Sequence, residues 1–118
     1  MGFSFDTETQ NGVCIISCKG RLMDKSEAIE FISEIDDHLI DGVKYFVLNF
    51  SNLEYINSSG LGVFINLLTR IRNAGGELIL TQIGDKIQQL MLITKLNSVF
   101  TITETTEDAL LRLVQPTQ

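Results

Sequence analysis

The chain opens with the two-residue alternation of apolar and polar side chains that is typical of half-buried β-strands. Residues 3–7 follow this pattern, and residues 13–18 form a second β-rich run. Between them stands Asn11-Gly12, a pair that tolerates the positive φ angles of a two-residue hairpin turn. The pattern predicts two antiparallel strands, with Gly20 as the end of the hairpin.

A helical period follows the hairpin. Asp24 and Glu27 have the spacing of a capping box, in which each side chain accepts the other residue's backbone N–H. Apolar residues then recur every three or four positions, and Asp41-Gly42 ends the pattern. An amphipathic first helix is therefore predicted, with a buried face formed by Ala28, Phe31, Ile32, Ile35 and Leu39.

The middle of the chain contains its most apolar strand and helix. Residues 45–50 (YFVLNF) form a nearly continuous apolar run, which is typical of an interior strand covered on both faces. A short polar stretch and residues 53–56 lead to a second helix, expected at about residues 60–74. Gly75-Gly76 ends this helix.

The remaining residues predict two more strands and two more helices. Strands are expected at residues 78–83 and 99–102, with a helix capped by Asp85 and Gln88 between them, and a last helix begins at residue 105 or 106. The order is β-β-α-β-α-β-α-β-α. It predicts an α/β fold: a mixed sheet of about five strands, antiparallel in the opening hairpin and otherwise largely parallel, with about four helices.

Composition is that of a small globular domain. The 118 residues are 44% hydrophobic and 20% charged, which suits one domain over residues 1–118, with a core at about 3–113 and a polar tail at 114–118. The net charge of −6 argues against a nucleic-acid partner, because nucleic acid is also negative. No membrane interaction is expected, since no apolar run approaches the roughly 18 residues that span a bilayer.

Two cysteines, Cys14 and Cys18, lie on one face of the second predicted strand. Their Cα atoms would be about 13 Å apart, which is beyond the reach of a disulfide. Two small core residues are a better interpretation than a metal pair, because no histidine is nearby. Since residues 1–10 also lack a secretory pattern, a reducing cytoplasm is expected.

Residues 55–63 (YINSSGLGV) form the segment in which chemistry is most expected. They follow the carboxyl end of the interior strand and begin the most apolar helix, a place where ligands gather in open α/β sheets. Free backbone N–H groups and the helix dipole favour an anion there. Ser58 is expected at the helix cap, where it accepts from the next turn and where a phosphate would be tolerated.

The same segment also has a purely structural interpretation. A lone serine at a helix start is usually only a cap. Gly60 and Gly62 each cost about 1 kcal/mol relative to Ala within a helix, so their presence indicates a close approach to the backbone. Either a partner surface or the sheet itself satisfies that condition.

Residues 57–63 (NSSGLGV) resemble the D-S-S/T-G-L-G-V segment of bacterial anti-sigma factor antagonists. The surroundings are similar too: Gly20 follows the second strand, residues 47–50 (VLNF) precede the motif and residues 75–78 (GGEL) follow the helix. The resemblance extends from about residue 3 to residue 113. It is specific for the STAS domain and implies a STAS-like fold.

Such a resemblance implies partner switching. The unmodified antagonist binds an anti-sigma factor that is also a serine kinase, and the sigma factor is freed. The kinase phosphorylates the first serine of the motif, here Ser58, the phosphorylated form dissociates, and a metal-dependent phosphatase restores it. The resemblance thus implies a transcription regulator that is not an enzyme and that binds no cofactor or metal.

One residue departs from the family pattern, because Asn57 stands where the family usually has Asp. Asparagine can cap a helix, but it lacks the carboxylate that would lie beside the phosphate and face the phosphatase metal. Phosphorylation at Ser58 is still expected. The step that Asn57 is expected to affect is removal of the phosphate by the phosphatase.

The partner surface is expected to combine the loop at residues 21–25, the motif and the exposed side of the following helix. The loop belongs to it because it also leaves the carboxyl end of a strand. The residues assigned to partner binding are Asp24, Asn57, Ser58, Ser59, Gly60, Leu61, Gly62, Asn66 and Arg70.

Two alternatives belong to other functional classes. An enzyme is the weaker one, because a serine nucleophile needs a nearby base and the only histidine, His38, is expected on the solvated side of the first helix. The sequence has no G-x-S-x-G elbow, P-loop or dinucleotide fingerprint, although a Ser-Lys arrangement stays open. The stronger alternative is a non-switching STAS scaffold in a stress-sensing assembly, or an accessory subunit of an ABC transporter.

Overall fold

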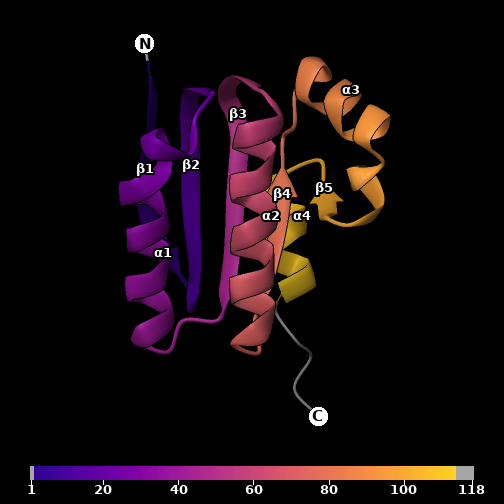
Figure 1. Cartoon of the computed structure of the whole chain (residues 1–118). Helices are drawn as coiled ribbons and strands as arrows, with labels where there is room; N and C mark the ends of the chain where they lie inside the picture. The colour runs from indigo at the N-terminus through magenta and orange to yellow at the C-terminus, as the bar shows by residue number, and fades with distance from the viewer. Residues whose placement is uncertain (1, 114–118) are drawn as a thin grey trace.

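The computed structural model describes residues 2–113 and contains one five-stranded sheet with helices on both faces (Figure 1). The strands lie in chain order; the first pair is antiparallel and every later pair is parallel. They are β1 (Phe3–Gln10), β2 (Val13–Leu22), β3 (Tyr45–Ile56), β4 (Glu77–Thr81) and β5 (Thr101–Thr103). The predicted fold class is confirmed. The polar tail expected at residues 114–118 lies outside the described residues.

The described residues form four α-helices: α1 (Ile29–Ile40), α2 (Ser58–Asn73), α3 (Asp85–Thr94) and α4 (Thr106–Leu113). Two short 3-10 helices, η1 (Lys25–Ala28) and η2 (Leu96–Ser98), precede α1 and β5. In Figure 1, α1 and α2 lie side by side in front of the sheet, and α4 lies behind it. Among residues 2–113, no helix has the length and apolarity needed to cross a membrane.

Both faces of the sheet are packed, and the front core is the larger one. Phe31 of α1 and Phe64 of α2 meet edge to face, with ring centroids 5.9 Å apart, and Phe64 lies 4.9 Å from Phe50 of β3. On the rear face, Val47 of β3 packs in a smaller cluster with Ala109 of α4. The interior strand is therefore covered on both sides, as its continuous apolar run predicted.

The opening hairpin turns at the predicted residues. Asn11 and Gly12 have φ angles of 54° and 82°, as a two-residue hairpin turn requires. Pairing between β1 and β2 ends at Gly20, but β2 itself continues to Leu22. The strand is longer than predicted because its other edge still pairs with β3.

Other boundaries also differ from the prediction. β3 does not stop at residue 50 but continues to Ile56, since it keeps pairing with β2 beyond an irregularity in their register. β4 ends at Thr81, before Gln82, which adopts a left-handed φ of 57°. The last strand covers Thr101–Thr103 rather than residues 99–102.

Two of the predicted caps are wrong in detail. Asp24 caps η1 rather than α1, and its carboxylate accepts the N–H two residues further on at 3.0 Å. The Glu27 carboxylate accepts from the N–H of Met23 at 3.0 Å, so no reciprocal box forms. At α3 the cap is Gly84 without a side-chain bond, and Asp85 is already helical.

Cys14 and Cys18 are buried in the front core as free thiols. Burial raises the pKa of the Cys14 thiol to about 12, with a smaller contribution from the Glu34 carboxylate. Burial alone raises the pKa of the Cys18 thiol. Both thiols therefore stay protonated at neutral pH and act as the small core residues that the sequence predicted.

Candidate functional site

The motif lies at the edge of the sheet where the carboxyl ends of β2 and β3 meet. Leu22 is opposite Ile56 in the parallel register, so both strands leave the sheet together. β2 continues into η1 and β3 into α2, and the backbone N–H of Asn57 donates to the Leu22 carbonyl oxygen at 3.4 Å. The loop at residues 21–25 and the motif are therefore neighbours.

Asn57, and not Ser58, caps α2. Its Oδ1 accepts from the N–H of Gly60 at 2.9 Å, and its Nδ2 donates to the carbonyl oxygen of Met23 at 2.9 Å. An aspartate could make the first of these bonds but not the second, because a carboxylate has no N–H to donate. The predicted cap is thus wrong by one residue, and Asn57 ties the start of α2 to the loop after β2.

Ser58 is the first residue of α2, and its side chain is exposed. Among residues 2–113 its hydroxyl makes no hydrogen bond, since the capping bond expected of it is made by Asn57. Ser59 is exposed as well. Both hydroxyls lie at the end of the helix where free N–H groups and the dipole favour negative charge.

The two glycines of the motif have different surroundings. Gly60 is buried, and a Cβ built there would lie 2.2 Å from the Leu22 carbonyl oxygen, so glycine alone lets α2 approach the end of β2 this closely. A Cβ at Gly62, which is exposed, would meet nothing within 4 Å. Leu61 is buried in the front core. Packing therefore accounts for Gly60 and Leu61, whereas Gly62 leaves open space on the surface.

A groove runs between α2 and the η1–α1 segment, and we call it the α1–α2 groove. Its volume is about 470 Å³, and its lining consists of Lys25, Ile32, Ser59, Gly62, Val63, Asn66 and Arg70. The five lining residues from α2 recur every three or four positions and so share one side of that helix. Four residues assigned to partner binding meet here: Ser59, Gly62, Asn66 and Arg70. Asp24 is exposed but does not line the groove.

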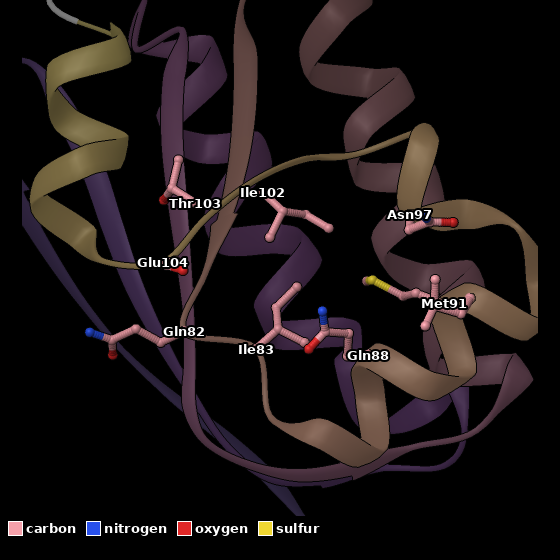
Figure 2. A pocket seen from close by; sticks show the side chains of 9 residues that line it. Gln82, Ile83, Gln88, Met91, Asn97, Ile102, Thr103 and Glu104 are labelled. Atoms are coloured by element: carbon pink, nitrogen blue, oxygen red, sulfur yellow. The ribbon is translucent and has the colours of Figure 1, made fainter.

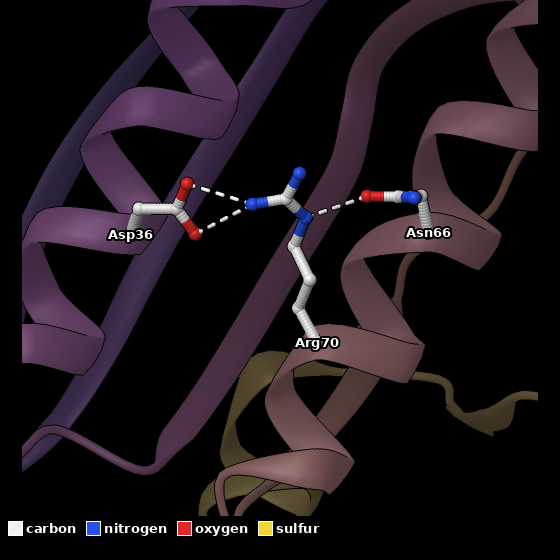
Figure 3. A network of polar contacts seen from close by, with 3 residues as sticks. All are labelled: Asp36, Asn66 and Arg70. Carbon is white, nitrogen blue, oxygen red and sulfur yellow. Dashed lines mark hydrogen bonds and ion pairs between the residues drawn. The ribbon is translucent and has the colours of Figure 1, made fainter.

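Arg70 joins the two helices that form the groove (Figure 3). Its Nη1 donates to both carboxylate oxygens of Asp36 on α1, at 3.0 and 2.7 Å, and its Nε donates to Asn66 Oδ1 at 2.6 Å. The pair is partly exposed and contributes at most about 1 kcal/mol to stability. Sequence reasoning missed Asp36, because this contact joins residues 34 positions apart and leaves no local pattern.

Comparison with known protein families completes the description of this site. The model of the STAS domain matches residues 4–109. The chain belongs to the STAS domain family. Among similar curated proteins, the anti-sigma-B factor antagonist of Staphylococcus aureus is 27% identical in an alignment of 111 residues that covers 91% of this chain and 98% of the relative.

Solved structures are similar to this STAS domain over nearly its whole length. A candidate anti-sigma factor antagonist from Thermotoga maritima is 26% identical, with a TM-score of 0.83 over 92% of this chain and 93% of that one. The Bacillus protein SpoIIAA in its phosphorylated form is 19% identical, with a TM-score of 0.72 over 94% and 100% of the two chains. At the latter identity the likeness is one of fold.

His38 of this STAS domain is not the solvated residue that the sequence predicted. Its side chain is only 22% exposed, its Nε2 lies 3.1 Å from a Glu34 carboxylate oxygen, and its ring packs edge-on against Phe46. His38 also stands in the last turn of α1, whereas Ser58 begins α2 at the opposite edge of the sheet (Figure 1). The two therefore cannot act together as base and nucleophile.

A second hollow of about 360 Å³ lies between the end of β4, α3 and β5 (Figure 2), and we call it the α3–β5 hollow. Its lining consists of Gln82, Ile83, Gln88, Met91, Leu92, Asn97, Ile102, Thr103 and Glu104. None of the residues assigned to partner binding belongs to it, and Glu104 is its single ionisable group. Within residues 2–113, no three His, Cys, Asp or Glu side chains are grouped to hold a metal ion.

Proposed function

We propose that this STAS domain is an anti-sigma factor antagonist that works by partner switching. Unmodified, it binds an anti-sigma factor with serine kinase activity, and the sigma factor is released. Phosphorylation at Ser58 ends this binding, and a metal-dependent phosphatase restores it. The observation that carries the proposal is the Ser58 hydroxyl, which is exposed at the first position of α2 and unbonded among the described residues.

The relatives support a regulatory protein. The Staphylococcus aureus relative is named as the antagonist of an anti-sigma factor, and SpoIIAA is known in a phosphorylated form. We propose accordingly that residues 1–118 act as one STAS domain in the cytoplasm, without a catalytic residue, cofactor, nucleic-acid partner or membrane partner.

A phosphate on Ser58 would change binding while leaving the fold intact. It brings about −1.5 to −2 charges to a helix end that favours an anion. The two capping bonds of Asn57 do not involve Ser58 and are retained. In a packed interface, by contrast, an unpaired charge costs several kcal/mol, and about 4 kcal/mol lowers affinity roughly a thousandfold.

The residues proposed for the partner surface divide into two groups. Exposed groups that a partner can touch directly are Asp24, Ser58, Ser59, Gly62, Asn66 and Arg70. Asn57, Gly60 and Leu61 act through the structure, because they cap the helix and pack its first turn against the end of β2. Removing a group of the second kind changes stability as well as binding.

Identification of the phosphorylated residue tests the first half of the proposal. The unmodified chain is used to capture its partner from the native cell, and a captured kinase is incubated with ATP and the wild type, Ser58→Ala or Ser59→Ala. Mass spectrometry should place one phosphate on Ser58 in the wild type and in Ser59→Ala, and none in Ser58→Ala. Phosphate confined to Ser59 would contradict the proposal.

Binding of the same kinase tests the switch. Isothermal titration should show affinity about a thousandfold lower for Ser58→Asp and unchanged for Ser58→Ala. All three forms should melt at nearly the same temperature, because the helix end accommodates negative charge. Equal affinities would leave Ser58 with only a structural role and would favour the scaffold or transporter-subunit alternative.

A further inference from the structure

The α1–α2 groove has apolar walls and open space between them. Val63 is buried in its wall, and Ile32 is partly buried on the opposite side. Gly62 between them has no side chain, and the space that a Cβ would enter is empty to 4 Å. An apolar side chain from another protein could therefore enter here and contact Val63 and Ile32.

The charge of this groove is opposite to that of the protein. The chain carries a net charge of −6, yet no carboxylate lines the groove, whereas two cations do: Lys25, and Arg70, which is paired with Asp36 beside the lining. Four other hollows among residues 2–113 each include a Glu in their lining. The groove is therefore a local cationic site on an acidic molecule, which favours negatively charged groups of a partner.

The two cations stand near opposite ends of the groove and have donors to spare. Lys25 makes no ion pair with any residue in 2–113 and shares the groove with Ser59. Arg70 follows Ser59 by eleven helical positions, or about 16 Å along α2. Asp36 and Asn66 engage Nη1 and Nε of Arg70, and the remaining guanidinium nitrogen makes no hydrogen bond among residues 2–113.

We propose that the α1–α2 groove receives a segment of the partner protein in which an apolar side chain stands between two carboxylates. The apolar side chain packs on Val63 and Ile32, one carboxylate meets Lys25, and the other meets the free nitrogen of Arg70. This inference rests on the proposed function, because the segment belongs to the anti-sigma factor kinase that binds the unmodified form.

Such an acidic segment also explains the direction of the switch. Ser59 lines the groove at the end occupied by Lys25, and Ser58 is its neighbour at the start of α2. A phosphate there competes with the partner's carboxylate for Lys25 and repels it as a like charge. The same modification would have less effect on a partner segment that carried no acid.

Charge variants at Lys25 test the acidic segment by titration against the captured kinase. Lys25→Glu should lower affinity at least tenfold, Lys25→Gln should lower it several-fold, and 1 M salt should reduce both differences. Lys44→Glu is the matched control, because Lys44 is also exposed and unpaired within residues 2–113 but precedes β3 at the opposite edge. If the kinase binds the wild type and Lys25→Glu equally, the acidic segment is wrong and the proposed function stands.

A small-molecule probe tests the groove when no kinase binds. Hexanoate combines an apolar chain with a carboxylate, and hexylammonium has the same chain with the opposite charge. In two-dimensional NMR of the whole chain, hexanoate should shift the amide signals of Ser59, Gly62 and Asn66 saturably. Hexylammonium should not shift them, and Lys25→Glu should abolish the effect of hexanoate. Shifts by hexanoate without kinase binding would refute the proposed function and the kinase as the source of the segment, and would support the groove as a site for an apolar acid. Equal responses to both probes would refute the acidic segment.

Discussion

The two halves of the sheet's carboxyl edge are built differently. At the β2–β3 half, which bears the motif, Asn57 donates hydrogen bonds to the carbonyl oxygens of Leu22 and Met23 and accepts one from the N–H of Gly60. The close packing of Gly60 also fixes this turn. At the β4–β5 half, Gln82 has a left-handed φ of 57°, and the Thr81 hydroxyl is buried without a hydrogen-bond partner among residues 2–113.

Side-chain exposure shows the same contrast. Leu92 and Ile93 of α3 are 55% and 79% exposed, and the neighbouring strand β5 has three residues. α2, by comparison, buries seven residues along its sixteen. The proposed phosphorylation site therefore lies on the half whose backbone is held from several directions. A charge added to such a rigid turn acts on a binding partner rather than on the fold, which is what a switch by repulsion requires.

Gly60→Ala should produce the largest loss of stability, because it disrupts the close packing of α2 on the end of β2 that distinguishes the β2–β3 half. The new methyl group would lie 2.2 Å from the Leu22 carbonyl oxygen, so α2 must move away from β2. We expect about 3 kcal/mol of destabilisation in chemical denaturation. Gly62→Ala is the matched control and should be neutral or stabilising by up to about 1 kcal/mol, because its Cβ enters open space. Equal effects of the two changes would contradict the contrast between the two glycines.

Asn57→Ala should have the next largest effect, about 2 kcal/mol of destabilisation, because it removes two hydrogen bonds of about 1 kcal/mol each. Asn57→Asp keeps the bond to Gly60 and loses the one to Met23, so about half of that loss is expected. Thermal and chemical denaturation measure both variants. An aspartate variant as stable as the wild type would mean that the bond to Met23 contributes nothing to holding the loop.

The sequence was sufficient for the fold because its signals are local. The Asn11-Gly12 turn, the apolar run at residues 45–50 and the helical periods each depend on neighbouring residues alone. The extension of β3 to Ile56 was not predictable, because the polar residues after position 50 read as a loop and only pairing with β2 keeps them extended. The cap was predicted one residue too late because it also depends on a contact distant in sequence. Asn57 and Ser58 are both good capping residues, and the hydrogen bond from Asn57 to Met23 decides between them.

At the β4–β5 half, replacing either of two threonines on neighbouring strands should change stability less, and the two replacements should have opposite signs. Thr81 and Thr103 are register partners, but only Thr103 has a bonded hydroxyl, which donates to the Thr105 carbonyl oxygen at 2.9 Å. Thr81→Val should stabilise the protein by about 1 kcal/mol, because it removes an unpaired buried hydroxyl and keeps the side chain's shape. Thr103→Val should destabilise it by a similar or smaller amount. Destabilisation by both variants, measured in urea, would show that the Thr81 hydroxyl has a partner in solution.

The ion pair between Asp36 and Arg70 should have the smallest effect on stability and a separate effect on binding. A double-mutant cycle with Asp36→Asn and Arg70→Gln should give a coupling of about 0.5 kcal/mol that disappears in 1 M salt, because both side chains are partly exposed. Arg72, which stands in the same last turn of α2 as Arg70, forms a matched pair with Glu77, with Nε and Oε1 3.1 Å apart, and should show a similar coupling. The two pairs should differ in binding of the kinase. Asp36→Asn leaves the Arg70 cation in the groove but releases its guanidinium, so affinity should fall by about two- to fivefold through lost preorganisation, whereas Glu77→Gln should leave affinity unchanged. Equal changes from both variants would mean that the Asp36–Arg70 pair does not position Arg70 for a partner, and that the binding surface is fixed only near the turn at Asn57.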